Sequence, residues 1–224
     1  MRILYWNTCI TTDPQALFDR LSLFHQLYGG IDYFCLNEAT PQLVELMRGA
    51  GWRIFHVDNT DVKGVAIASR HPLRQKRSYL LSSVSRQGRQ DKNHLLMVEA
   101  YWRNKPVTIA TTHLTYLRFK EIRRRRQERK ELVRILPRNR TVFGGDLNTI
   151  VIPFAKWDVE QLGYQNKVKG KTWCWHLKNT LRRIPVKLQL DYVFATHDIR
   201  DVVEAKILKE QGISDHFPIL VTLY

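Results

Sequence analysis

The chain has 224 residues, with 36 Lys and Arg against 21 Asp and Glu, a net charge of +15 and a pI near 10.0. Hydrophobic residues make up 44% of the chain and aromatic residues 11%, which excludes wholesale disorder. The length suits one folded domain, which we expect to span residues 1–224. The positive charge favours polyanionic partners, with a merely basic solubility surface as the alternative.

No apolar run reaches the roughly 18–20 residues that span a bilayer. Residues 1–7 have the pattern of a strand, so we expect no signal peptide. Three cysteines, Cys9, Cys35 and Cys174, stand at unrelated spacings, which argues against a disulfide framework or a zinc site. We therefore expect an intracellular monomer, cytoplasmic or in the nucleoid or nucleus, without stable membrane association.

Strand and helix patterns alternate along the first fifty residues. Residues 2–7 and 31–36 alternate or run apolar like strands. Proline in the first turn and glycine after the last turn mark two helices, which run from Pro14 to Gly29-Gly30 and from Pro41 to Gly51. This opening is typical of α/β proteins.

The rest of the chain has mostly strand patterns. Two further helices are predicted at residues 118–136 and 155–164, and loops such as residues 85–93 are expected between the strands. The predicted strands are 52–57, 64–69, 76–84, 94–102, 107–111, 141–144, 171–175, 190–195, 202–207 and 217–223.

Polar residues cluster in six short segments at the ends of predicted strands, where α/β sheets usually gather their sites. Any one of them has a structural explanation, such as a turn cap, but together they supply carboxylates, amides and two histidines. Such oxygen-rich ligands suit Mg²⁺ or Mn²⁺ better than zinc. The segments are Tyr5-Trp6-Asn7, Leu36-Asn37-Glu38, Thr112-His113-Leu114, Gly144-Gly145-Asp146-Leu147-Asn148, Leu190-Asp191-Tyr192 and Ser214-Asp215-His216.

The order of these segments resembles the endonuclease/exonuclease/phosphatase superfamily, which includes DNase I, exonuclease III, tyrosyl-DNA phosphodiesterases, neutral sphingomyelinases and inositol polyphosphate phosphatases. The resemblance runs from Asn7 to His216 and includes the segment at residues 64–73. It implies a four-layer α/β sandwich of two packed mixed β-sheets flanked by helices. It also implies a metal-dependent hydrolase that cleaves phosphodiester bonds.

The resemblance also implies residue roles. Glu38 matches the principal metal carboxylate, with Asn7 and Asp215 near the same Mg²⁺ or Mn²⁺ ion. Asp146 matches the residue that orients or deprotonates the attacking water, and Asn148 can donate to a phosphoryl oxygen. Asp191 and His216 match a carboxylate–imidazole pair, in which a protonated His216 would contact the phosphate. The sequence leaves open whether Asp146 or His216 is the base.

His113 resembles the histidine of DNase I, the tyrosyl-DNA phosphodiesterases and the sphingomyelinases. As a second cationic imidazole it would stabilise the pentacovalent phosphate or assist the leaving group. Its carboxylate partner is not readable from the sequence, and Asp58 and Asp61 are candidates.

Two basic stretches bear on the substrate. Residues 118–140 carry eleven Lys and Arg, including Arg123–Arg126, which we interpret as mostly structural. Residues 161–190 carry seven Lys and Arg, no acid, and three large aromatics, a pattern that favours nucleic acid. The nucleic-acid-binding residues predicted there are Lys167, Lys169, Lys171, Trp173, Arg182 and Arg183.

The sequence therefore predicts a nuclease, either a DNA endonuclease or a DNA-end-processing enzyme, with DNA favoured over RNA. One alternative is a phosphatase or phospholipid phosphodiesterase of the same superfamily, acting on inositol phosphates or sphingomyelin. The other is an inactive nucleic-acid-binding module on the same fold, which the filled catalytic segments disfavour.

Overall fold

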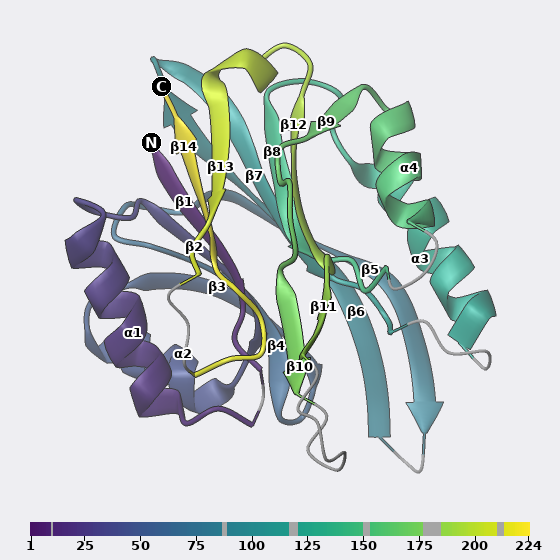
Figure 1. Ribbon diagram of the computed structural model, residues 1–224, viewed down its shortest axis with the longest axis horizontal. Helices are drawn as coiled ribbons and strands as arrows, with labels where there is room; N and C mark the ends of the chain where they lie inside the picture. The colour runs from purple at the N-terminus through teal and green to yellow at the C-terminus, as the bar shows by residue number, and fades with distance from the viewer. Residues whose placement is uncertain (10, 87–88, 117–120, 150–152, 177–184, 210–212) are drawn as a thin grey trace.

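The computed structural model describes all residues except 10, 87–88, 117–120, 150–152, 177–184 and 210–212. In this part of the chain, two six-stranded sheets pack face to face, and helices cover their outer faces (Figure 1). The four-layer α/β sandwich predicted from the sequence is confirmed.

The first sheet has the strand order β13-β14-β1-β2-β4-β3. Strands β1 and β2 are parallel, and the other neighbours are antiparallel. The strand bounds are β1 Arg2–Asn7, β2 Tyr33–Ala39, β3 Arg53–Thr60, β4 Lys63–Ser69, β13 Val203–Ile207 and β14 Ile219–Leu223.

The second sheet has the order β5-β6-β7-β8-β12-β9, with β7 and β8 parallel. A separate antiparallel pair, β10 and β11, projects at the end of the sandwich opposite the chain termini (Figure 1). The bounds are β5 Arg74–Arg86, β6 Arg89–Trp102, β7 Lys105–His113, β8 Thr141–Asp146, β9 Tyr164–Asn166, β10 Trp173–His176, β11 Pro185–Leu188 and β12 Asp191–Thr196.

The first two helices begin where the sequence signals indicated, and α3 begins at Ile122, within the range predicted for it. Asp13 accepts a hydrogen bond from the Ala16 amide at the start of α1, and Thr40 caps α2 through the Leu43 amide. The helices are α1 Pro14–Leu27, α2 Pro41–Gly49, α3 Ile122–Ile135 and α4 Phe154–Gln161, with a 3-10 turn, η2, at Arg200–Val202.

Three apolar layers hold the sandwich together. The inner faces of the two sheets form the central layer, where Ile67, Ile109 and Val193 are fully buried. Helices α1 and α2 pack on the outer face of the first sheet, and α3 and α4 pack on that of the second. Burial of this apolar surface is the main force that fixes the two sheets relative to each other.

Three local expectations were wrong. The loop expected at residues 85–93 is a hairpin, because β5 and β6 stay paired up to Arg86 and Arg89, with residues 87–88 outside the described residues. Its polar composition resembles that of a loop because the ribbon extends beyond the packed sheet. The short strands β9 and β11 were missed, and α4 ends at Gln161, so that Tyr164 begins β9.

The two ends of the chain lie side by side at one end of the sandwich (Figure 1). The Leu223 amide donates to the Met1 carbonyl, which extends the pairing of β1 and β14. No helix in the described part of the chain is long and apolar enough to cross a membrane.

Candidate active site

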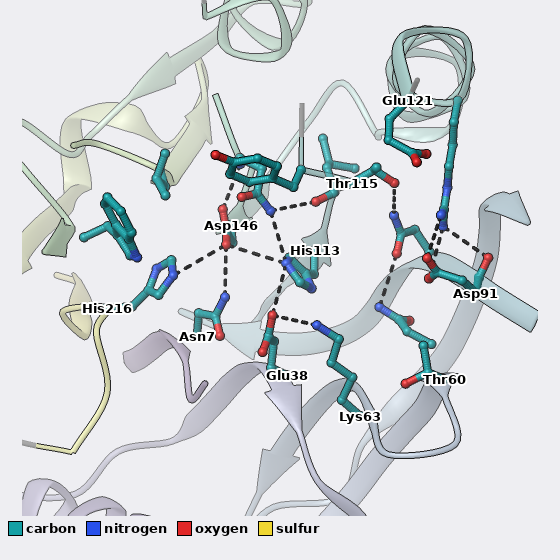
Figure 2. A pocket seen from close by; sticks show the side chains of 18 of the residues that line it. Asn7, Glu38, Thr60, Lys63, Asp91, His113, Thr115, Glu121, Asp146 and His216 are labelled. Atoms are coloured by element: carbon teal, nitrogen blue, oxygen red, sulfur yellow. Dashed lines mark hydrogen bonds and ion pairs between the residues drawn. The ribbon is translucent and has the colours of Figure 1, made fainter. Parts of the chain in front are cut away.

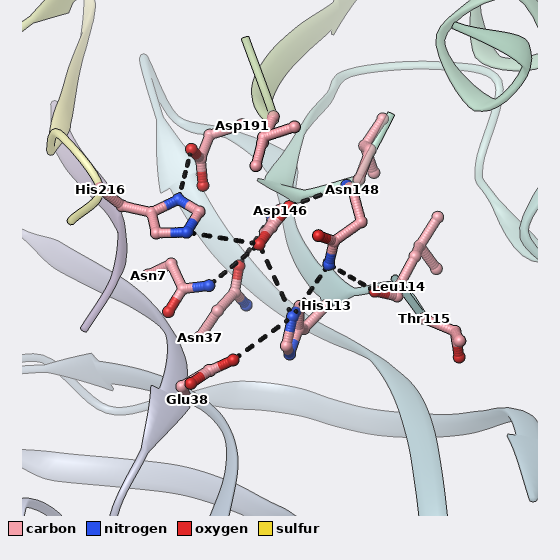
Figure 3. A network of polar contacts seen from close by, with 12 residues as sticks. Asn7, Asn37, Glu38, His113, Leu114, Thr115, Asp146, Asn148, Asp191 and His216 are labelled. Atoms are coloured by element: carbon pink, nitrogen blue, oxygen red, sulfur yellow. Dashed lines mark hydrogen bonds and ion pairs between the residues drawn. The ribbon is translucent and has the colours of Figure 1, made fainter. Parts of the chain in front are cut away.

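The predicted site residues meet at one edge of the sandwich because the strand registers align them. Asn7 pairs with Asn37 across the parallel strands β1 and β2, and Asp146 pairs with both His113 and Asp191 in the second sheet. The Asp146 amide donates to the Asn37 side chain at 2.9 Å, and the Asn7 amide donates to the Asp146 carboxylate at 3.0 Å (Figure 3). These two bonds join the sheets at the site.

The glycine before Asp146 makes this close approach possible. Gly145 has a φ of +134°, and an added Cβ would overlap the Thr112 carbonyl oxygen of the adjacent strand. It would also lie 3.0 Å from the Asn37 side-chain oxygen that holds Asp146. Glycine is needed here because an L side chain is strained at this φ and has no room.

Glu38 enters the site through an irregularity in β2. The pairing of β2 with β4 shifts register between Asn37 and Ala39, and Glu38 has a φ of +56°. Its carboxylate Oε1 lies 2.7 Å from the Lys63 ammonium and 3.7 Å from His113 Nε2. Such backbone strain is characteristic of functional positions.

Asp146 is buried at the centre of the site. It accepts hydrogen bonds from the Asn7 side chain and from the Asn148 backbone amide, the latter at 2.8 Å. Burial raises the pKa of Asp146 to about 7, and the nearby Asp191 carboxylate adds to the rise. His216 and the two hydrogen bonds favour the ionised form and limit the increase.

His216 and Asp191 form the predicted carboxylate–imidazole pair, with Nδ1 and Oδ2 2.8 Å apart. Burial alone would lower the pKa of His216, but Asp191, followed by Asp146 and Asp215, outweighs it and raises the pKa to about 10. The second ring nitrogen lies 3.8 Å from Asp146. At neutral pH His216 is therefore an imidazolium that faces the buried aspartate.

His113 differs from the cationic imidazole expected from the sequence. Burial lowers its pKa to about 4, the positive charges of Lys63 and His216 act in the same direction, and Glu38 only partly opposes them. The Asn148 amide nitrogen donates to the Leu114 carbonyl and also lies 3.2 Å from His113 Nε2. An amide nitrogen only donates, so this ring nitrogen is the acceptor of a neutral imidazole.

The carboxylates near His113 also differ from the two suggested by the sequence. Among the described residues, Glu38 and Asp146 lie 3.7 and 3.6 Å from its Nε2 atom. Asp58 instead lies 3.6 Å from His56, and Asp61 is exposed in the turn between β3 and β4.

Asp215 lies on the His216 side of the site. Its Oδ2 atom accepts a hydrogen bond from the Trp173 indole at 2.9 Å, and its backbone carbonyl accepts one from Cys174. Trp173 also forms a β-bridge with His216, so the β10–β11 hairpin is attached directly to the site. Among the described residues, Asp215 Oδ1 is buried without a hydrogen-bond partner.

Two groups of side chains could hold a cation. Of the ligands predicted from the sequence, Glu38 and Asn7 line the same cleft, while Asp215 lies beside His216 with its Oδ1 atom free of hydrogen bonds among the described residues, which fits a cation ligand. Asp146, Asp191 and His216 also place potential ligand atoms within 4.8 Å of one another. The second group is poorly suited while His216 is protonated, because an imidazolium nitrogen has no free lone pair.

Asn7, Glu38, Asp146 and His216 line a cleft of about 550 Å³ that extends well past them (Figure 2). Trp173, Leu188 and Leu190 line it beside His216. At the other end its walls are formed by Asn59, Thr60, Asp91, Asn93, Thr115 and Arg124.

The predicted nucleic-acid-binding residues are only partly gathered at the cleft. Trp173 lines it, while Lys169 and Lys171 are exposed in the segment that precedes it. The Lys167 ammonium donates to the Arg200 carbonyl at 2.9 Å, in the η2 turn near the chain termini. Arg182 and Arg183 lie outside the described residues.

Two of the four consecutive arginines of α3 are structural, as the sequence led us to expect. Arg124 is buried and pairs with Asp91 at 2.8 Å, and Arg125 is buried with a hydrogen bond to the Leu147 carbonyl. Arg123 and Arg126 are exposed.

Two polar residues of the site had no role assigned from the sequence. Lys63 is the first residue of the otherwise apolar strand β4, and nothing in the sequence indicated that its side chain reaches Glu38. Asn37 belongs to a recognised segment, but its bond to the Asp146 backbone depends on the packing of two distant strands.

The comparisons agree with this geometry. Residues 4–216 match the Endonuclease/Exonuclease/phosphatase family. No sequence among the curated proteins matches the chain.

Solved structures share the fold at low sequence identity. An endonuclease/exonuclease/phosphatase family protein from Leptotrichia buccalis C-1013-b is 15% identical with a TM-score of 0.75, and the match covers 100% of this chain and 99% of that one. D. rerio TDP2 complexed with single strand DNA product is 17% identical with a TM-score of 0.69, covering 99% and 97%. The mannosyl-6-phosphatase Bt3783 of Bacteroides thetaiotaomicron VPI-5482 is 14% identical with a TM-score of 0.71, covering 100% and 99%. The chain belongs to the Endonuclease/Exonuclease/phosphatase family.

Proposed function

We propose that this protein is a divalent-metal-dependent phosphodiesterase that hydrolyses nucleic acid, with DNA as the favoured substrate. Its family acts on phosphodiesters or phosphate esters. One observation carries the proposal: Glu38, His113, Asp146 and His216 line one cleft, and Asp191 holds the His216 ring from behind.

Glu38, with Asn7 and Asp215, would hold the Mg²⁺ or Mn²⁺ ion. Carboxylate and amide oxygens are the ligands that such hard cations prefer. A bound cation would offset the negative charge that develops on the phosphate in the transition state. The Asp146, Asp191 and His216 group is the less favoured position because His216 is protonated at neutral pH.

The pKa values support Asp146 as the base and His216 as an electrophile. His216, with a pKa of about 10, already carries its proton at neutral pH, so it is suited to donate a hydrogen bond to a phosphoryl oxygen. Asp146, with a pKa of about 7, is partly ionised there and can accept a proton from water. Asp191 would maintain the tautomer and orientation of His216.

His113 and Asn148 would complete the phosphate site. They are 3.2 Å apart, and both line the cleft. Asn148 would donate to a phosphoryl oxygen, and a phosphate beside His113 would favour the protonated form of its imidazole. That change would convert a neutral ring into a donor to the substrate or the leaving group.

Three observations favour nucleic acid as the substrate. The net charge of +15 attracts a polyanion, and the indole of Trp173 lines the cleft wall where a base could stack. The D. rerio TDP2 structure with a single strand DNA product has the same fold. The proposed binding residues are Trp173, Lys167, Lys169, Lys171, Arg182 and Arg183, with Lys169 and Lys171 the exposed members among the described residues.

A phosphatase acting on a phosphorylated sugar is the second candidate. The mannosyl-6-phosphatase of the same fold supports it, and one part of the cleft wall here is polar. An inactive binding module is disfavoured, since Glu38, Asp146 and His216 line one cleft and Asp191 is paired with His216 beside it.

A substrate panel separates these functions. Purified protein with Mg²⁺ or Mn²⁺ should cleave at least one of supercoiled plasmid, single-stranded DNA, abasic DNA, 5′-phosphotyrosyl DNA and RNA. Asp146→Asn should abolish that activity, and Asp201→Asn, at an exposed carboxylate, should leave it unchanged. Efficient hydrolysis of sugar phosphates or inositol phosphates with every nucleic acid left intact would favour the phosphatase instead.

A further inference from the structure

The cleft has two unlike ends on either side of the reacting groups (Figure 2). Beside His216 its wall is apolar, formed by Trp173, Leu188 and Leu190. The other end, beyond Lys63 and Thr115, is polar: the amides of Asn59 and Asn93 line it together with the charged groups of Asp91, Glu121 and Arg124. A substrate phosphate between Asp146 and His113 would place one of its two substituents at the apolar end of the cleft and the other at the polar end.

The polar end is anchored by Glu128, a fully buried carboxylate on α3. Its neighbours are all donors, so the group between them must only accept. An ionised carboxylate does so, whereas an amide would turn an N–H toward one of them. The donors are Ser82 Oγ at 2.6 Å, Asn93 Nδ2 at 2.7 Å, Thr115 Oγ1 at 2.5 Å and the Thr115 backbone amide at 3.0 Å, and the Arg124 and Arg125 guanidinium groups lie 3.3 and 3.5 Å away.

Glu128 fixes the direction of a hydrogen-bond chain that leads to the cleft. Asn93 must present its NH₂ group to Glu128 and Thr115, so its carbonyl faces Asn59. Asn59 must then present its own NH₂ group to that carbonyl, at 3.5 Å. This leaves the Asn59 carbonyl oxygen at the end of the chain.

That oxygen is an acceptor that lacks a donor. Asn59 is 3% exposed and lines the cleft, and among the described residues its Oδ1 atom has no hydrogen-bond partner. A buried polar atom without a partner costs about 1–3 kcal/mol, which a ligand that supplies a donor would recover.

We infer that the polar end of the cleft is a recognition subsite for a hydrogen-bond donor on the nucleotide next to the cleaved phosphodiester, with Asn59 Oδ1 as its acceptor. This inference rests on the proposed function. The donor is either a sugar hydroxyl or an exocyclic amino group of a base. Asn59 therefore determines specificity. Glu128 makes the subsite a hydrogen-bond acceptor, because it fixes the orientation of the Asn93 and Asn59 amides.

The test compares oligonucleotides that differ by one group at a nucleotide flanking the cleavage position. One pair carries a 2′-hydroxyl or a 2′-fluorine at that sugar, and the other carries adenine or purine as the base. We expect the donor-bearing member of one pair to be cleaved with a kcat/KM about tenfold higher, the effect of one good hydrogen bond. The pair that responds identifies the source of the donor.

Three variants complete the test. Asn59→Ala should abolish the preference, so that the two members of the pair have about equal kcat/KM. Asn139→Ala, which removes an exposed amide at the far end of β8, should leave the preference intact. Glu128→Gln removes the buried carboxylate that orients the two amides, so the preference should weaken or invert, and the melting temperature should fall because Arg124 and Arg125 lose their ion-pair partner. Loss of fold in Glu128→Gln would leave the Asn59→Ala comparison to decide.

Binding in the Asp146→Asn background separates this inference from the proposed function. Donor-dependent binding without cleavage by the parent enzyme would contradict the proposed function and support the subsite. Cleavage with equal kcat/KM for both members of each pair, or a preference that Asn59→Ala leaves unchanged, would overturn the subsite alone. Failure to bind any oligonucleotide would overturn both.

Discussion

Replacing Asp191 by asparagine should remove most of the stabilisation that the imidazolium of His216 receives. The pKa of His216 is about 10 against an ordinary value of 6.5, and Asp191 is the largest cause of the increase. At 1.36 kcal/mol per pH unit, the difference corresponds to a preference of about 5 kcal/mol for the charged form. Breaking a buried pair by removing one partner costs about 3–5 kcal/mol, which agrees in size.

The sign of the pH dependence follows from the raised pKa. The contribution of His216 to the free energy of unfolding is fully present below pH 6.5 and is lost as the pH rises through 10. Asp191→Asn should therefore be least stable relative to the parent protein near pH 6. The gap between the two proteins should narrow between pH 6.5 and 10.

Urea unfolding at several pH values measures this gap, and a titration of the His216 ring by NMR measures the pKa directly. The matched control is Glu45→Gln, which removes the carboxylate of an exposed ion pair with Arg48 and should cost at most about 1 kcal/mol. A His216 pKa near 6.5 in the parent protein would refute the reasoning. So would an Asp191→Asn destabilisation that does not change with pH.

Three further predictions concern the metal, the turn before Asp146 and the substrate. Chelation with EDTA should abolish phosphodiester cleavage, and full activity in excess EDTA would exclude a role for the metal. Glu38→Gln should raise the Mg²⁺ concentration needed for half-maximal rate by at least about tenfold, as measured by metal titration. Gly145→Ala should lower the free energy of unfolding by more than about 2 kcal/mol, because the new Cβ overlaps the Thr112 carbonyl oxygen at a left-handed φ. Urea unfolding measures this loss, and an unchanged midpoint would contradict the prediction. Replacing Lys169 and Lys171 by glutamine should weaken nucleic-acid binding. The slope of log binding constant against log salt concentration, measured by fluorescence anisotropy, should fall by about 0.7–0.9 for each phosphate that the protein no longer neutralises. An unchanged slope would mean that the strand binds elsewhere.

The sequence predicted the architecture well where short-range signals decide it. Pro14 and Pro41 mark two helix starts, and buried apolar runs mark the central strands. The β5–β6 ribbon was missed because its outer part extends past the sheet, where neither face must be apolar. Strand β9 has only three residues and one partner strand, which leaves no periodicity to read.

The candidate site was predictable as a set of residue types, but its electrostatics were not. Asn7 and Asp146 end strands β1 and β8, whose parallel pairings bring them to one edge, and His216 precedes β14, which pairs with β1. The neutral state of His113 depends on the burial of most of its side chain and on Lys63, which belongs to a different strand. Such states depend on distances between groups far apart in the sequence.

The hydrogen-bonded series from Glu128 through Asn93 to Asn59 is another feature that the sequence does not predict. Glu128 looks like one acid on a basic helix, and its role as an acceptor appears only when β5, β6 and α3 pack together. Asn59 and Asn93 are 34 positions apart and carry no motif. Their orientation is set by the donors around Glu128.

The central claim is that the cleft at the strand ends performs phosphodiester hydrolysis with Asp146 as the base. Its most direct test is single-turnover cleavage of the best nucleic-acid substrate by the parent enzyme and by Asp146→Asn at saturating Mg²⁺, with binding measured in parallel. We expect Asp146→Asn to reduce the rate of the chemical step by about 10²–10⁴-fold and to change the dissociation constant by less than about threefold. A variant that cleaves as fast as the parent enzyme, or one whose reduced activity is explained by weaker binding, would contradict it.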